Sequence, residues 1–124
     1  MMRYQALAIP SPVVPYVRMT RRSKYASDRA QRYLSNQAVL RALMANEMVG
    51  REPFARTPLK VDMAFYEAGS VDHRRDLDNL VKAVLDAGKG VLWEDDRWID
   101  EVRATREAWE HDEDQVSILI WEMN

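Results

Sequence analysis

Two aspartates and a lysine stand close together in residues 74–82, Arg-Arg-Asp-Leu-Asp-Asn-Leu-Val-Lys. Asp76 and Asp78 are two positions apart, which places their side chains on the same side of an extended segment but on roughly opposite faces of a helix. We therefore expect a helix to begin at about Asp78, a good N-cap residue, with Asp76 just before it. Both carboxylates would then converge at the helix N-terminus, and Lys82 would lie one helical turn from Asp78.

Carboxylates that converge in this way repel each other unless a positive charge lies between them. Hard divalent cations such as Mg²⁺ bind through carboxylates, water and substrate phosphate. Phosphodiester hydrolysis uses such ions to create a hydroxide nucleophile and to neutralise the charge that develops in the transition state. A lysine beside the metal can stabilise the same charge. The residue types therefore fit metal-dependent cleavage of a phosphodiester.

The two aspartates are also compatible with a purely structural role, because an aspartate at a helix N-terminus caps the helix and interacts favourably with its dipole. A Ca²⁺-binding helix-loop-helix is disfavoured, because Leu80 and Val81 occupy the next ligand position and the glycine turn position. A phosphatase-like Asp-x-Asp of the haloacid dehalogenase type would follow an apolar strand, whereas residues 72–75 are Asp-His-Arg-Arg. On the residues alone, capping and metal binding both stay open.

The first half of the chain predicts a strand, a long helix and a second strand. Residues 3–9 are expected to form a strand that ends at three closely spaced prolines. Ser27 or Asp28 can cap a helix that runs to about Val49. Residues 57–67 alternate between apolar and polar side chains, as in a half-buried strand. The apolar stripe of the helix, which two polar residues interrupt, consists of Ala30, Tyr33, Leu40, Met44 and Met48.

The second half predicts a helix and two strands. Apolar residues at helical spacing begin at Leu77 and continue to Leu85, with Gly88 past the helix end. Residues 99–109 and 115–122 are expected to form strands joined as a hairpin by residues 110–114. The last strand is apolar on both faces, which favours a central position in a sheet or a buried dimer surface. The order β-α-β-α-β-β predicts an α+β fold with a mixed sheet of about four strands and two main helices.

The composition limits the class of protein. A length of 124 residues suits one domain, expected to span residues 1–124. No apolar run reaches the ~18 to 20 residues of a membrane span, and the N-terminal residues lack the apolar stretch of a secretion signal. We therefore expect a cytoplasmic protein. The chain has no cysteine, which excludes disulfides, thiolate metal sites and cysteine nucleophiles.

The charge is divided unevenly along the chain. Residues 1–60 hold 11 Lys and Arg against three acidic residues, whereas residues 61–124 hold 7 against 17. A basic half suits a polyanion and an acidic half suits cations. The alternative is that folding mixes the two halves into a neutral surface.

A longer pattern resembles a known family. Residues 74–83 read Arg-Arg-Asp-Leu-Asp-Asn-Leu-Val-Lys-Ala, the helix ends in Leu-Asp-Ala at 85–87, and Trp-Glu-Asp-Asp follows at 93–96. Together these motifs are similar to the core of the RusA family of Holliday-junction resolvases. The resemblance is close over residues 74–103 and looser over the N-terminal Pro-x-Pro and the Arg-rich segment after it.

The resemblance implies a set of catalytic residues. It implies that Asp76, Asp78 and Asp96 bind Mg²⁺, with Mn²⁺ able to substitute, and that Lys82 is needed for catalysis. Asp86 also matches the family pattern, and we interpret it as structural. The family works as a symmetric homodimer whose two sites nick opposed strands of a four-way DNA junction, and a bacterial, prophage or phage origin is typical of it.

Basic and polar side chains near these motifs are candidates for DNA contacts. An N-terminal arm, residues 16–27, carries four basic residues with tyrosines among them, which suits phosphate binding and stacking on unpaired bases. The expected DNA-binding residues are Arg18, Arg21, Arg22, Lys24, Arg74, Arg75 and Asn79. The alternative for the arm is a solvated loop.

The sequence therefore predicts a Mg²⁺-dependent endodeoxyribonuclease that resolves four-way junctions by paired nicks. Two alternatives stay open. One is a nuclease of the same fold that prefers flaps or replication forks. The other is a non-catalytic DNA-binding protein that retains the carboxylates only as helix caps.

Overall fold

The computed structural model describes residues 2–18, 28–68, 75–107 and 113–123. The elements in these residues confirm the predicted order β-α-β-α-β-β and the α+β class, with two main helices and a mixed four-stranded sheet. They are β1 (Tyr4–Ile9), α2 (Asp28–Glu47), β2 (Leu59–Tyr66), α3 (Leu77–Gly88), the short 3-10 helix η2 (Asp96–Trp98), β3 (Ile99–Glu107) and β4 (Gln115–Glu122).

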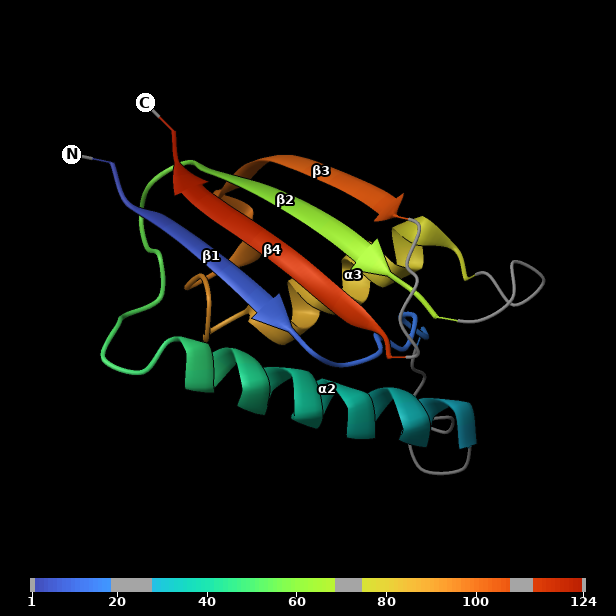
Figure 1. The fold of residues 1–124 in the computed structure, drawn as a ribbon. Helices are drawn as coiled ribbons and strands as arrows, with labels where there is room; N and C mark the ends of the chain where they lie inside the picture. Colours follow the sequence, from blue (N-terminus) through green and yellow to red (C-terminus); the bar gives the residue numbers. More distant parts are fainter. Residues whose placement is uncertain (1, 19–27, 69–74, 108–112, 124) are drawn as a thin grey trace.

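The four strands lie in the order β1-β4-β2-β3 (Figure 1). β4 pairs antiparallel with both β1 and β2, and β2 pairs in parallel with β3. The predicted hairpin between β3 and β4 is therefore wrong, because β2 lies between them. The physical reason is composition. β4 is apolar on both faces and takes a central position, whereas the strongly charged β3 takes an edge.

Both helices pack on one face of the sheet (Figure 1). All five members of the predicted α2 stripe are buried. Gln37 is one of the two polar residues that interrupt this stripe, and its side-chain amide donates a hydrogen bond of 2.9 Å to the Ala83 carbonyl of α3. Arg41 likewise donates to the Ala87 carbonyl at 3.2 Å. These bonds fix α3 beside α2, so the position of the residues on α3 depends on α2. Within the described residues, no helix is long and apolar enough to cross a membrane.

α3 buries only part of its predicted apolar stripe. Leu80 and Val84 are buried in the core. Leu77, Val81 and Leu85 are half-buried, and at i, i+4 and i+8 they form a line along the flank of α3 away from α2. The helix leaves an apolar flank partly exposed to solvent.

The segment after α3 is held by a buried tryptophan. The Trp93 ring lies so close to Gly88 that a Cβ there would be 2.5 Å from a ring carbon, which explains a glycine in the last turn. The backbone of Phe54 pairs with this segment. Its N–H donates to the Leu92 carbonyl at 2.9 Å and its carbonyl accepts from the Glu94 N–H at 2.8 Å. These contacts fix where the following aspartates lie.

Candidate active site

Asp76 and Asp78 lie at the start of α3, and both are exposed. The helix begins at Leu77, so the N-cap is Asp76 and not Asp78 as expected. The Asp76 side chain makes no capping hydrogen bond, although its carbonyl accepts the Leu80 N–H at 3.1 Å. Capping therefore does not explain the Asp76 carboxylate. Asp78, in the first turn, lies at the positive end of the helix dipole, which favours a negative charge.

Lys82 lies one turn after Asp78 and is supported by an aromatic pair. Its Nζ is 5.7 Å from the centroid of the Tyr16 ring. That ring packs edge-on against Tyr33, with centroids 5.7 Å apart and planes at 87°. The Tyr33 hydroxyl donates to Asp86 at 2.7 Å. Burial is the larger cause and this hydrogen bond the next of a raised pKa of Tyr33, which keeps the hydroxyl protonated. This hydrogen bond links α3 to α2 and is consistent with the structural role expected of Asp86.

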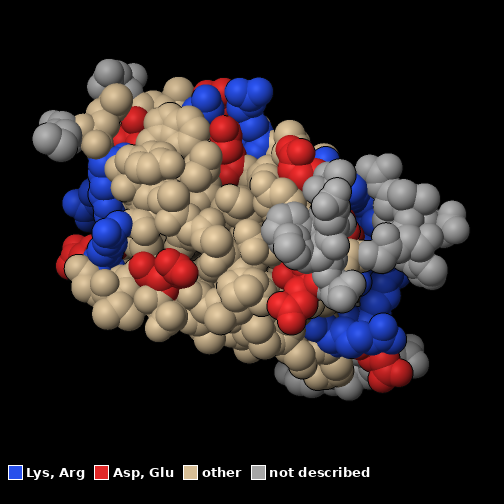
Figure 2. Space-filling model, in the orientation of Figure 1, with Lys and Arg blue, Asp and Glu red and all other residues tan. Residues whose placement is uncertain are grey.

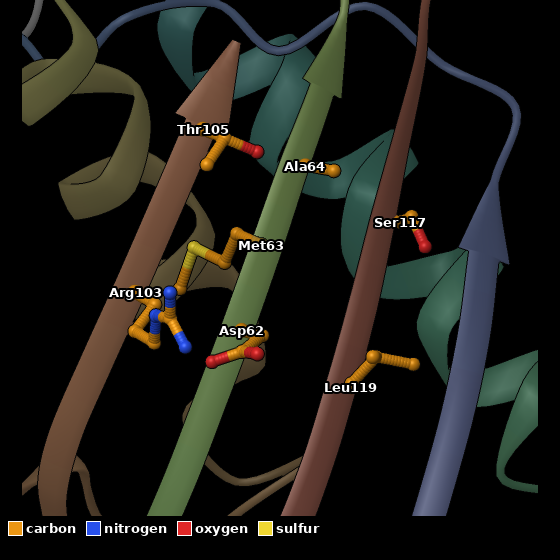
Figure 3. Close-up of a pocket in the computed structure, with 7 residues that line it drawn as sticks. All are labelled: Asp62, Met63, Ala64, Arg103, Thr105, Ser117 and Leu119. Atoms are coloured by element: carbon orange, nitrogen blue, oxygen red, sulfur yellow. The ribbon is translucent and has the colours of Figure 1, made fainter. Parts of the chain in front are cut away.

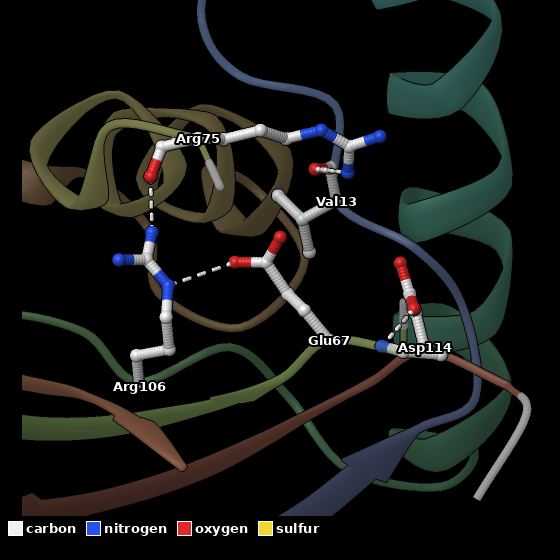
Figure 4. A network of polar contacts seen from close by, with 6 residues as sticks. Val13, Glu67, Arg75, Arg106 and Asp114 are labelled. Atoms are coloured by element: carbon white, nitrogen blue, oxygen red, sulfur yellow. Dashed lines mark hydrogen bonds and ion pairs between the residues drawn. The ribbon is translucent and has the colours of Figure 1, made fainter. Parts of the chain in front are cut away.

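The backbone that leads into Asp76 is anchored to the end of β3 (Figure 4). The Arg106 guanidinium donates to the Arg75 carbonyl, and its Nε forms an ion pair of 3.1 Å with Glu67. Arg75 in turn donates to the Val13 carbonyl at 3.2 Å. Because Arg75 directly precedes Asp76, these contacts restrain where the Asp76 carboxylate can lie.

Asp96 lies at the opposite end of β3 from these residues. It begins η2, which leads directly into Ile99 at the start of β3. Arg106, which contacts Arg75, is near the other end of the same strand. The part of β3 from Ile99 to Arg106 is roughly 20 Å long at about 3.3 Å per residue. Asp96 precedes one end of this part and Asp76 lies near the other, so roughly 20 Å separates the two aspartates. In one chain, Asp96 does not meet the two carboxylates of α3.

The neighbouring Asp95 has a local structural role. Its Oδ1 accepts the Arg97 N–H at 3.1 Å and so caps η2. This backbone hydrogen bond is the main reason that the pKa of Asp95 lies below its usual value. Of the acidic pair, Asp95 therefore shapes the turn and Asp96 presents an exposed side chain.

The described part of one chain holds two of the three expected metal ligands at one place. Across residues 2–18, 28–68, 75–107 and 113–123, no group of three acidic or histidine side chains could hold a metal ion together. Asp76 and Asp78 share the start of α3, with Lys82 one turn away. This set can offer oxygen ligands and one ammonium, which is the chemistry of a partial site for a hard cation and a phosphate.

A comparison with protein families decides which class of protein carries this arrangement. The profile of the family described as endodeoxyribonuclease RusA matches residues 10–120, nearly the whole chain. The chain belongs to the RusA family. The resemblance predicted from residues 74–103 is thereby confirmed, and the protein is an endodeoxyribonuclease at the level of its family. No curated protein matches the sequence.

In this RusA-family chain, the expected DNA contacts have different surroundings. Arg18 and Asn79 line one open cleft together with Lys82. Arg75 is half-buried and donates a hydrogen bond to the Val13 carbonyl, so its side chain anchors the backbone before Asp76. Four of the expected residues lie outside the part that the structure describes: Arg21, Arg22, Lys24 and Arg74.

Arg29 was missed by the sequence analysis. It lies in the first turn of α2 and lines the same cleft as Arg18 and Lys82. No local pattern marks it, because it is one of several arginines on an exposed helix face. The packing of α2 against α3 brings it to the candidate site.

The uncovered face of the sheet is a separate surface. Figure 2 shows acidic and basic side chains side by side on this face, with uncharged residues over much of its middle. A cavity of about 250 Å³ opens on it, lined in part by Asp62, Arg103 and Ser117 (Figure 3). Asp62 has one buried oxygen with no hydrogen-bond partner in the described residues. None of the predicted catalytic residues lines this cavity.

Proposed function

We propose that this protein is a Mg²⁺-dependent, structure-selective endonuclease that resolves four-way DNA junctions by paired nicks. The observation that carries the proposal is the Asp76 carboxylate, which is exposed and does not cap the helix it precedes. Helix capping therefore does not account for this carboxylate, in a chain that belongs to an endodeoxyribonuclease family.

The donor set fits a hard divalent cation. Mg²⁺ is usually held by one or two carboxylates together with water and substrate phosphates, and Asp76 and Asp78 supply two carboxylates at one helix terminus. When bound, such an ion supplies positive charge beside the phosphate and lowers the pKa of a coordinated water. Lys82 would place its ammonium against the same phosphate, where a compact charge stabilises the transition state.

Asp96 enters the proposal through a second copy of the chain. Because roughly 20 Å of β3 separates Asp96 from Asp76 within one protomer, we propose that the partner subunit's Asp96 completes each site. A two-fold axis would bring the η2 end of one β3 to the Arg106 end of the other. The homodimer would then hold two equivalent sites, as a junction with two-fold symmetry requires.

One edge of the molecule suits this arrangement. The line of Leu77, Val81 and Leu85 along α3 is only half-buried, and Val102 on the neighbouring edge strand β3 is 40% exposed. Asp78 lies next to this line around the helix. An antiparallel contact of two such edges would cover apolar surface and bring the partner's η2 toward Asp78. We propose this edge as the dimer contact.

The test is nicking of a synthetic mobile four-way junction by the purified protein. Linear duplex, a 5′ flap and a replication fork of the same sequence serve as comparison substrates, each with Mg²⁺, Mn²⁺, Ca²⁺ or EDTA. The proposal expects symmetric nicks in the junction with Mg²⁺ or Mn²⁺ and almost none with EDTA. Preferential cutting of the flap or fork would favour the first alternative. Tight junction binding without any cleavage would favour the non-catalytic DNA-binding protein.

A further inference from the structure

Three cationic side chains from three separate elements face one cleft beside the candidate active site. The cleft has a volume of about 600 Å³ and is lined by Tyr16, Val17, Arg18, Arg29, Asn79 and Lys82. Arg18 comes from the segment after β1, Arg29 from the first turn of α2 and Lys82 from α3. Among the residues that the structure describes, none that lines the cleft is acidic.

The three cations are not neutralised by neighbours that the structure describes. The ion pairs between described residues are Lys60 with Glu101 and Arg106 with Glu67, and neither involves a cation of the cleft. Like charges gathered at one place repel each other, which costs free energy unless an anion binds there. Local helix pairing does not explain the group either, because the three residues are far apart in the sequence. Such a cleft is suited to an anion.

The wall that carries Tyr16 and Arg18 is fixed between the two helices. Asn36, buried on α2, accepts the Val14 N–H at 2.8 Å and donates to the Pro12 carbonyl at 2.8 Å. The Tyr16 N–H donates to the Asn79 carbonyl on α3 at 3.0 Å. The backbone that leads into Arg18 is therefore anchored to both helices before any ligand arrives, which lowers the entropic cost of forming this wall of the cleft.

We propose that this cleft binds a backbone phosphate of the DNA strand next to the phosphate that is cut, with Arg29 and Arg18 as its contacts. The cleft reaches Asn79 and Lys82, which follow Asp78 within one turn of α3. A strand whose scissile phosphate lies between Asp78 and Lys82 would pass its neighbouring phosphate to Arg29. This inference rests on the proposed function, since it names a subsite of the same nuclease site.

The test compares Arg29→Ala with Arg32→Ala. Arg32 is exposed on the same helix, three residues from Arg29, and does not line the cleft, so both variants lose the same charge. Junction affinity is measured by fluorescence anisotropy at several NaCl concentrations in EDTA. Arg29→Ala is expected to weaken binding about tenfold and to lower the log–log salt slope by about 1 per bound protomer. Arg32→Ala should stay within about twofold of wild type, and Arg29→Lys should keep most of the slope.

A neutral methylphosphonate placed at single positions around the cut identifies the phosphate. In wild type, one position adjacent to the cut should reduce affinity, whereas Arg29→Ala should be insensitive to neutralisation at that position. Equal affinities and slopes for Arg29→Ala and Arg32→Ala, with a wild-type circular dichroism spectrum, would overturn the subsite. The proposed function fails separately, if the wild-type protein cuts no DNA in Mg²⁺ or Mn²⁺. A reduced slope for Arg29→Ala alone would still support the phosphate contact in that case.

Discussion

At the residue scale, the carboxylates of α3 differ in what holds them. Asp76 is positioned through its backbone, by the hydrogen bond from Arg106 to the preceding carbonyl, whereas Asp78 is positioned by the first turn of the helix. Spacing alone predicted that the two carboxylates lie at the start of a helix with Lys82 one turn later, whereas their catalytic roles were implied only by the family resemblance. The predicted N-cap, Asp78, is wrong: the N-cap is Asp76, two residues earlier, because a shift of one or two residues in a helix start leaves the same apolar pattern.

We predict that Asp76→Asn, Asp78→Asn and Asp96→Asn each lower the nicking rate at least about 100-fold, because each removes a charged oxygen ligand of the cation. Junction affinity should stay the same or rise slightly, since a negative charge near DNA is lost. Single-turnover cleavage and anisotropy measure the two effects. Glu94→Gln is the control, because Glu94 is exposed in the same segment as Asp96. Near-normal nicking by any of the three aspartate variants would remove that residue from the ligand set.

A second prediction at this scale concerns the aromatic support of Lys82. The Lys82 ammonium lies over the Tyr16 ring, and such a contact contributes about 0.5–1 kcal/mol at an exposed site. Tyr16→Leu should therefore lower the single-turnover rate about two- to fivefold, with little change in junction affinity. Tyr16→Phe keeps the ring and should cleave as wild type does. If Tyr16→Phe and Tyr16→Leu were equally impaired, the hydroxyl and not the ring would matter.

At the scale of elements, β3 joins the two ends of the candidate site. Near its last residue, Arg106 donates a hydrogen bond to the Arg75 carbonyl. Its first residue, Ile99, directly follows η2, which begins at Asp96. The alternation of apolar residues predicted the strands themselves. It did not predict that β3 pairs with β2 and not with β4, because strand order depends on contacts between distant residues that a local pattern does not contain.

We predict that Arg106→Ala raises the Mg²⁺ concentration needed for half-maximal nicking severalfold, because the backbone before Asp76 loses its anchor. The variant should also lose about 1–3 kcal/mol of unfolding free energy, since Glu67 and the Arg75 carbonyl lose a charged partner. Metal titrations of the nicking rate and urea unfolding measure the two effects. Arg103→Ala is the matched control, because Arg103 lies on the same strand and lines the cavity of the uncovered face. An unchanged Mg²⁺ requirement in Arg106→Ala would contradict the positioning role.

At the scale of the whole molecule, the proposed dimer requires a surface that one chain leaves incomplete. Val102→Glu should shift the solution mass from dimer to monomer at micromolar concentration, because a charge would enter the apolar edge of α3 and β3. Val39→Glu is the control, since Val39 is 49% exposed on α2, away from that edge. Sedimentation equilibrium measures the mass. A dimer that persists in Val102→Glu would place the contact elsewhere.

The origin of the third carboxylate can be tested by mixing inactive chains. If the partner subunit's Asp96 completes each site, a mixed dimer of Asp78→Asn and Asp96→Asn chains has one site with both defects and one site with none. Mixing these two variants should therefore restore nicking of one strand of the junction, at a rate near that of one wild-type site, but not paired nicking. Mixing Asp76→Asn with Asp78→Asn is the control, because every site in that mixed dimer keeps one defect. The two mixtures separate the arrangements, since a site built within one chain would leave both inactive.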